Sequence, residues 1–150
     1  MLITAITTEE CREILARTGF GHLACSRDNE PYVIPIYFAY EPDHLYGFST
    51  FGQKIEWMRS NPRVCVAVDE VADQFNWASV IVKGQYKELS GTQEHNSERQ
   101  HAFELLEKRK LWWQTAEAAR EFRSAKPFPS IFYCISIEAM SGRRATPGNF

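Results

Sequence analysis

The spacing of polar and apolar positions near the start of the chain predicts a short amphipathic helix. Thr7 and Glu10 have the spacing of a capping box, which marks a helix start. Positions at helical intervals then share one face, and Gly19 is placed to end the helix. Those positions are Cys11, Ile14, Leu15 and Thr18.

Runs of β-branched and aromatic residues, separated by polar turns, predict a series of strands. Pro35 lies inside one run and cannot donate a ladder hydrogen bond, so that strand needs a bulge or an edge position. Gly84 lies inside another run, where it indicates a bulge or a corner. The predicted strands span residues 20–26, 31–40, 44–49, 63–70, 78–89 and 131–140.

Two other segments have helical character. Residues 52–60 place Ile55 and Met58 three apart and stop before Pro62, which predicts a short helix. Residues 92–124 are charged and contain neither Gly nor Pro, which predicts one or two helices with a break near Trp112 and Trp113. Residues 141–150 are expected to form a solvated tail.

This order of elements favours an α+β fold that is mainly β. Strands follow one another with few intervening helices, which is typical of an antiparallel barrel with peripheral helices and not of a doubly wound parallel sheet. A length of 150 residues fits one domain, covering residues 1–150.

Composition and charge argue against several classes of function. The net charge of −2 gives no basic excess to attract nucleic acid or an acidic membrane surface. The first residues lack the pattern of a signal peptide, and no run approaches the length of a membrane span. Four scattered cysteines without a CxxC pair are expected to be reduced, as in a cytoplasmic protein.

The most informative stretch for chemistry is residues 48–54, FSTFGQK, where a predicted strand runs into a predicted helix. Such a junction offers unpaired backbone N–H groups and the positive end of a helix dipole. Ser49 and Thr50 add hydroxyl groups, and Lys54 adds a positive charge. This combination suits a phosphate dianion, although a plain capped helix start has the same residue types and stays open as an alternative.

Residues 31–40, 45–70 and 77–89 together resemble the FMN-binding split-barrel superfamily. The closest branch is the group related to pyridoxamine 5′-phosphate oxidase, which includes the nitroimidazole-resistance-type flavoproteins. The likeness is good over roughly residues 5–90 and looser over the last strand. It implies an antiparallel split β-barrel that binds flavin mononucleotide (FMN) and works as a homodimer with the flavin at the interface.

The resemblance also implies roles for individual residues. The strand at Ile34, Pro35 and Ile36 would lie under the isoalloxazine ring. The other implied contacts are Ser49 and Thr50 to phosphate or ribityl oxygens, Gln53 and Lys54 to the phosphate, and Ser79 to the ring or ribityl chain. Related oxidases carry Arg where this chain has Gln53, which implies a weaker phosphate clamp.

Departures from true pyridoxamine-phosphate oxidases argue against that substrate. Their Arg-Leu-x-Pro-like C-terminus is absent; the basic tail at Arg143 and Arg144 is favoured as a solvated tail, with a position facing a ligand left open. The expected activity is an FMN-dependent oxidoreductase of nitroreductase or general reductase type, with a small-molecule electron donor and acceptor. The catalytic residues stay unknown. Trp112 and Trp113 would contribute to the dimer interface, to a lid over the ring, or simply to the core.

Two other functions stay open. One is a non-enzymatic flavin-binding sensor or carrier. The other is a haem-binding split barrel, for which His22 and His44 are the histidines in the barrel part. No metal site is expected, because His22 and Cys25 point to opposite faces of their strand.

Overall fold

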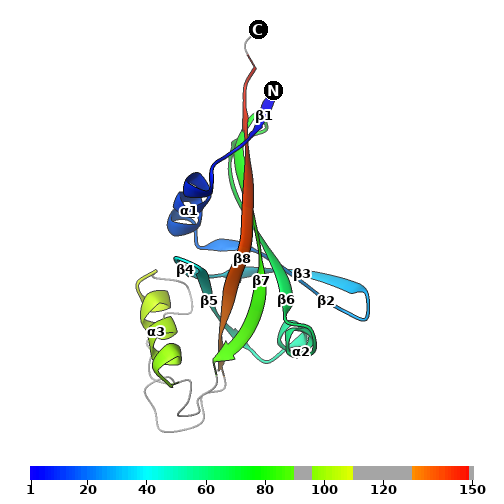
Figure 1. Ribbon diagram of the computed structural model, residues 1–150, viewed down its shortest axis with the longest axis vertical. Helices are drawn as coiled ribbons and strands as arrows, with labels where there is room; N and C mark the ends of the chain where they lie inside the picture. Colours follow the sequence, from blue (N-terminus) through cyan, green and yellow to red (C-terminus); the bar gives the residue numbers. More distant parts are fainter. Residues whose placement is uncertain (90–95, 110–129, 149–150) are drawn as a thin grey trace.

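The computed structural model describes residues 1–89, 96–109 and 130–148. These residues form one antiparallel sheet with three helices around it (Figure 1). The helices are α1 (Thr8–Arg17), α2 (Gln53–Ser60) and α3 (Asn96–Glu107). The strands are β1 (Leu2–Ala5), β2 (Phe20–Arg27), β3 (Glu30–Tyr37), β4 (Ala39–Glu41), β5 (His44–Thr50), β6 (Arg63–Asp73), β7 (Asn76–Leu89) and β8 (Ser130–Thr146).

The sheet curls so that its two ends face each other. Its strand order is β3-β2-β6-β7-β8-β5-β4, and β1 pairs with β8 beyond the end of β5. All pairings are antiparallel. Between β3 and β5 the described residues form no strand pairing, so the barrel is split there. The predicted antiparallel split barrel with peripheral helices is therefore confirmed.

Several local predictions are confirmed by the structure. Thr7 caps α1 by accepting a hydrogen bond from the Glu10 backbone N–H at 3.1 Å. Gly19, with φ of 111°, turns the chain out of the helix. Pro35 lies on β3, which is the edge strand of the sheet. A β-bulge lies at Gly84, where the β7–β8 register shifts between Lys83 and Gly84.

The barrel interior is filled by side chains from both halves of the sheet. Leu23, Val66 and Val80 are fully buried there, and Ile55 and Met58 of α2 close one end. A second cluster lies under α3, where Phe103 and Leu106 pack against Phe132 of β8. No helix among the described residues is long and apolar enough to cross a membrane. The prediction of one or two helices over residues 92–124 is confirmed for α3, whereas the rest of that segment from residue 110, with Trp112 and Trp113, lies outside the described residues.

The expectation of a solvated tail from residue 141 is wrong. Residues 141–146 continue β8, and Arg143 to Thr146 pair with β1, a strand the hydrophobic pattern did not predict. Gly142 and Ala145 are buried on this strand. Residues 141–146 form a strand because β7 pairs with them on one side and β1, at the other end of the chain, pairs with them on the other.

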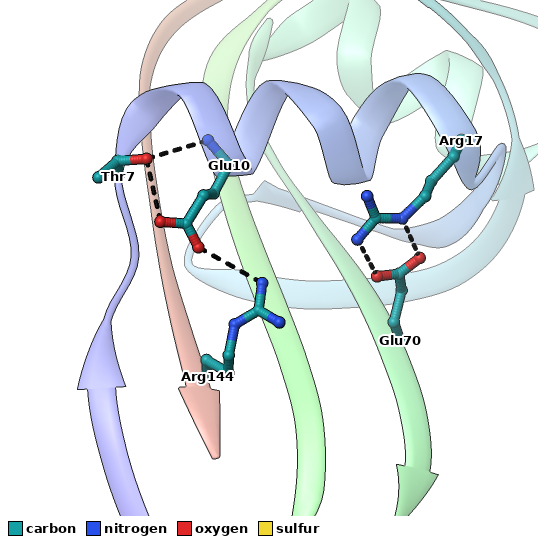
Figure 2. A network of polar contacts seen from close by, with 5 residues as sticks. All are labelled: Thr7, Glu10, Arg17, Glu70 and Arg144. Atoms are coloured by element: carbon teal, nitrogen blue, oxygen red, sulfur yellow. Dashed lines mark hydrogen bonds and ion pairs between the residues drawn. The ribbon is translucent and has the colours of Figure 1, made fainter. Parts of the chain in front are cut away.

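Ion pairs tie α1 to both sides of this extended part of the sheet (Figure 2). Glu10 accepts from Thr7 and lies 3.4 Å from Arg144 of β8. Arg17 donates two hydrogen bonds of 2.7 Å to the carboxylate of Glu70 on β6. These hydrogen bonds lower the pKa of Glu70 below its ordinary value.

Replacing Glu70 with Gln is expected to lower the melting temperature only slightly at neutral pH, because the pair is partly exposed. Since the pKa of Glu70 is depressed, its contribution is present above the ordinary carboxyl pKa and is lost as the pH falls through the folded-state value. Thermal unfolding of both proteins at neutral and at strongly acidic pH measures this. A difference that persists unchanged in strong acid would contradict it.

Candidate functional site

The two facing ends of the sheet enclose a cavity of about 470 Å³. It lies where β3 and the end of β5 approach each other, with the first turn of α2 at its side. Five of the predicted site residues line it: Pro35, Ile36, Ser49, Thr50 and Lys54. Phe20, Tyr37 and Phe48 complete the lining.

Lys54 brings a positive charge to this cavity, where no described carboxylate pairs with it. Its side chain is half-buried and makes no hydrogen bond or ion pair with any described residue. Burial lowers the pKa of the amine below its ordinary value, and the nearby thiol of Cys25 acts in the opposite direction. A buried ammonium is costly unless something anionic offsets the lost hydration. The cavity therefore favours an anion beside Lys54.

The start of α2 supplies further donors at the same place. Gly52 is the N-cap and no side chain caps the helix. The first backbone bond closing the helix runs from Glu56 to Gly52, so the N–H groups of Gln53 and Lys54 lie in the open first turn. A Cβ added to Gly52 would meet nothing within 4 Å, which leaves room for a ligand to approach the backbone.

The hydroxyl groups at the end of β5 are placed differently from each other. Ser49 is only 6% exposed and its Oγ donates to the Thr50 carbonyl at 2.7 Å. Thr50 is exposed at the cavity. A ligand oxygen would compete with the Thr50 carbonyl for the Ser49 hydroxyl, whereas the Thr50 hydroxyl is directly accessible.

An aromatic wall was missed by reasoning from the sequence. Phe20 and Tyr37 face each other across the β2–β3 register, and their rings meet edge to face at 5.2 Å between centroids. They are 46% and 39% exposed, which is unusual for such large apolar groups. The sequence could have predicted this pair, because a two-residue turn at Asp28 and Asn29 sets a hairpin register in which residues 20 and 37 are opposite each other.

The remaining predicted residues do not line the cavity. Ile34 packs against the barrel core, and Gln53 is exposed at the start of α2. Ser79 lies in the middle of the sheet on β7, between Asp69 of β6 and Arg143 of β8. A single chain therefore does not bring Ser79 to this cavity.

The two histidines considered as haem ligands also lie elsewhere. His22 is exposed on β2 beside the ring of Phe20. His44 stacks on Tyr46, away from the lining residues. Among the described residues, no group of three or more His, Cys, Asp or Glu side chains is placed to hold a metal ion.

This arrangement agrees with comparisons against known proteins. The family model for pyridoxamine 5′-phosphate oxidase matches residues 7–144. The chain belongs to this family. The resemblance inferred from the sequence is thus confirmed. The chain is also 40% identical to an uncharacterized protein from Rhizobium meliloti, over 99% of both chains.

Solved structures give the same fold. A FAD-binding protein from Mesorhizobium loti is 42% identical, with a TM-score of 0.80, 97% of this chain covered and 100% of that one. The FAD binding protein from Mycobacterium smegmatis is 23% identical, with a TM-score of 0.68, 97% of this chain covered and 100% of that one. The second likeness concerns the fold alone.

Proposed function

We propose that the cavity binds the FMN moiety of a flavin nucleotide, with the phosphate at Lys54 and the first turn of α2. The observation that carries this proposal is the half-buried, unpaired Lys54 beside an open helix N-terminus. Thr50 and Ser49 lie within the same lining and supply hydroxyl groups to the phosphate or the ribityl chain. The combination of a cation, backbone N–H groups and hydroxyl groups is the chemistry that a phosphate dianion requires.

The flat ring fits the other half of the cavity. Strand β3 pairs with β2 on one side and with no described strand on the other, so its outward N–H and C=O groups can bond the polar edge of an isoalloxazine. Pro35 and Ile36 would then lie under the ring, and Phe20 and Tyr37 would enclose it. The relative from Mesorhizobium loti, at 42% identity, is named for binding FAD, which contains the same ring and phosphate.

The activity we propose is that of an oxidoreductase with a small-molecule electron donor, such as NAD(P)H, and a small acceptor, such as a nitro compound or a quinone. A bound flavin supplies the electron transfer, and the protein supplies orientation, electrostatic tuning and control of water. Phe20 and Tyr37 exclude water from the ring, and Lys54 fixes the phosphate end. Four free cysteines, three of them buried, suit a reducing cytoplasm.

We further propose a homodimer, with the flavin at the interface between the subunits. Ser79 is predicted to contact the ring or ribityl chain, but it lies outside the cavity of its own chain. A second copy presenting the face of β7 and β8 around Ser79 would place that hydroxyl at the cavity. The exposed rings of Phe20 and Tyr37 would be covered in the same assembly.

The visible absorption spectrum of the purified protein, with its released chromophore identified by mass, tests the proposed function. We expect flavin absorption, and bleaching on anaerobic addition of NAD(P)H. Bound flavin that no donor reduces would favour the sensor or carrier over the enzyme. A colourless protein that takes up neither added FMN nor added FAD would overturn the proposed flavin site.

A further inference from the structure

Phe51 is an exposed aromatic residue that is next in the chain to the proposed phosphate site but does not line its cavity. It follows Thr50 and precedes Gly52, so it sits between a lining hydroxyl and the N-cap of α2. Its side chain is 60% exposed, more than any other aromatic side chain among the described residues. Exposure of a large apolar ring beside a ligand site indicates a surface that something covers when the ligand is bound.

The ring of Phe51 is held by a fixed cation. The guanidinium of Arg59, near the end of α2, lies 5.2 Å from the centroid of the ring. Arg59 is anchored by two hydrogen bonds to the Glu88 carboxylate, at 2.9 and 3.1 Å. Glu88 in turn accepts from the hydroxyl of Tyr86 at 2.8 Å. The ring of Phe51 therefore lies against a guanidinium whose position is fixed by Glu88.

The backbone between Phe51 and the first turn of α2 has open space beside it at Gly52. No atom would lie within 4 Å of a Cβ on Gly52, the residue between Phe51 and the first turn of α2. Gln53, next along the chain, is exposed and offers an amide at the same point. A group attached to a phosphate at Lys54 would reach the ring of Phe51 by passing over Gly52.

We propose that Phe51 and Arg59 form a subsite for the AMP half of FAD, with the adenine stacked on Phe51 and Arg59 beside the second phosphate. This inference rests on the proposed function, because it places the second half of the nucleotide relative to the first. An adenine is flat and aromatic and stacks on an exposed ring without sequence-specific contacts. FAD differs from FMN by this AMP group alone, so the subsite makes the chain select FAD over FMN.

The test compares the affinities of riboflavin, FMN and FAD for the unaltered protein and for Phe51→Ala, by titration calorimetry on protein freed of bound flavin. We expect the unaltered protein to bind FAD about tenfold or more tightly than FMN, from the usual strength of a base–aromatic stack. Phe51→Ala should lose most of that preference, with its affinity for FMN unchanged. Phe51→Trp should retain it.

The matched control is Phe75→Ala, which removes another exposed ring at the turn between β6 and β7, 47% exposed. It should leave all three affinities unchanged. Equal affinity of the unaltered protein for FMN and FAD, or equal weakening of both by Phe51→Ala, would overturn the adenine subsite while leaving the flavin site intact. Failure of all three ligands to bind would instead overturn the proposed function itself.

Discussion

Replacing Lys54 with Met is expected to weaken FMN binding about 10- to 100-fold and to leave riboflavin binding unchanged. Met keeps the apolar stem of the side chain and removes only the charge. A charge-assisted hydrogen bond to phosphate contributes roughly 1.5–3 kcal/mol, which corresponds to this range of affinity. Riboflavin lacks the phosphate, so the two ligands separate loss of the charge from general damage to the cavity.

The pH dependence of FMN binding provides a second signature of Lys54. A phosphate monoester becomes a dianion above about pH 6, so affinity should rise through that pH. Burial lowers the pKa of Lys54 below its ordinary value, so the amine loses its proton at a lower pH than an exposed lysine. Affinity should therefore fall again on the alkaline side, and Lys54→Met should lose this alkaline fall but keep the rise near pH 6.

The same depressed pKa predicts the opposite effect on the ligand-free protein. Between the folded-state and unfolded-state pKa values of Lys54, the unfolded chain binds the extra proton, so stability rises with pH across that window. At neutral pH the charged amine opposes folding, and Lys54→Met should be at least as stable as the unaltered protein in urea unfolding.

Lys83→Met, on the exposed side of β7, is the control and should change neither affinity nor stability appreciably. Weaker riboflavin binding by Lys54→Met would contradict a phosphate-specific role.

The elements predicted well from the sequence depend on interactions between near neighbours. The Thr7 cap is set by residues three apart, and the β2–β3 hairpin by the two residues of its turn. Pro35 could be assigned to an edge because proline lacks the N–H that an inner strand needs on one of its sides. Each of these follows from backbone chemistry that is complete within a few residues.

The features that could not be predicted depend on partners far apart in the chain. Arg143 to Thr146 form a strand between Leu2 to Ala5 on one side and the start of β7 on the other, both far away in the chain. The cavity has the same origin, because Ser49 and Lys54 meet Pro35 only when the sheet curls. Ser79 shows the converse, since its polar side chain on a strand was predicted to contact the flavin but does not line the cavity of its own chain.

Replacing Gly84 with Ala is expected to cost about 3 kcal/mol of stability, at the upper end of the usual cost of overpacking. The β7–β8 register shifts between Lys83 and Gly84, and Lys83 faces Ala139 while Gly84 faces Ile137. Glu138 is thus the extra residue of the bulge. A Cβ on Gly84 would lie 2.1 Å from the Ser136 carbonyl oxygen. That atom belongs to the backbone of a central strand and cannot move aside as a flexible side chain does.

Urea unfolding followed by tryptophan fluorescence measures this cost, with Lys83→Ala as the matched control in the adjacent, exposed position of the same strand. The control should change stability by no more than about 0.5 kcal/mol. A loss of 3 kcal/mol is a large fraction of the roughly 5–15 kcal/mol that holds a domain folded. Strand β8 pairs with β5 near the cavity and with β1 at its other end. Straightening or separating the strands at Gly84 would therefore disturb both pairings together. If Gly84→Ala unfolded at the same urea concentration as Lys83→Ala, the bulge would be able to relax. The close packing at Gly84 would then not be needed to align the part of β8 that pairs with β5 with the part that pairs with β1.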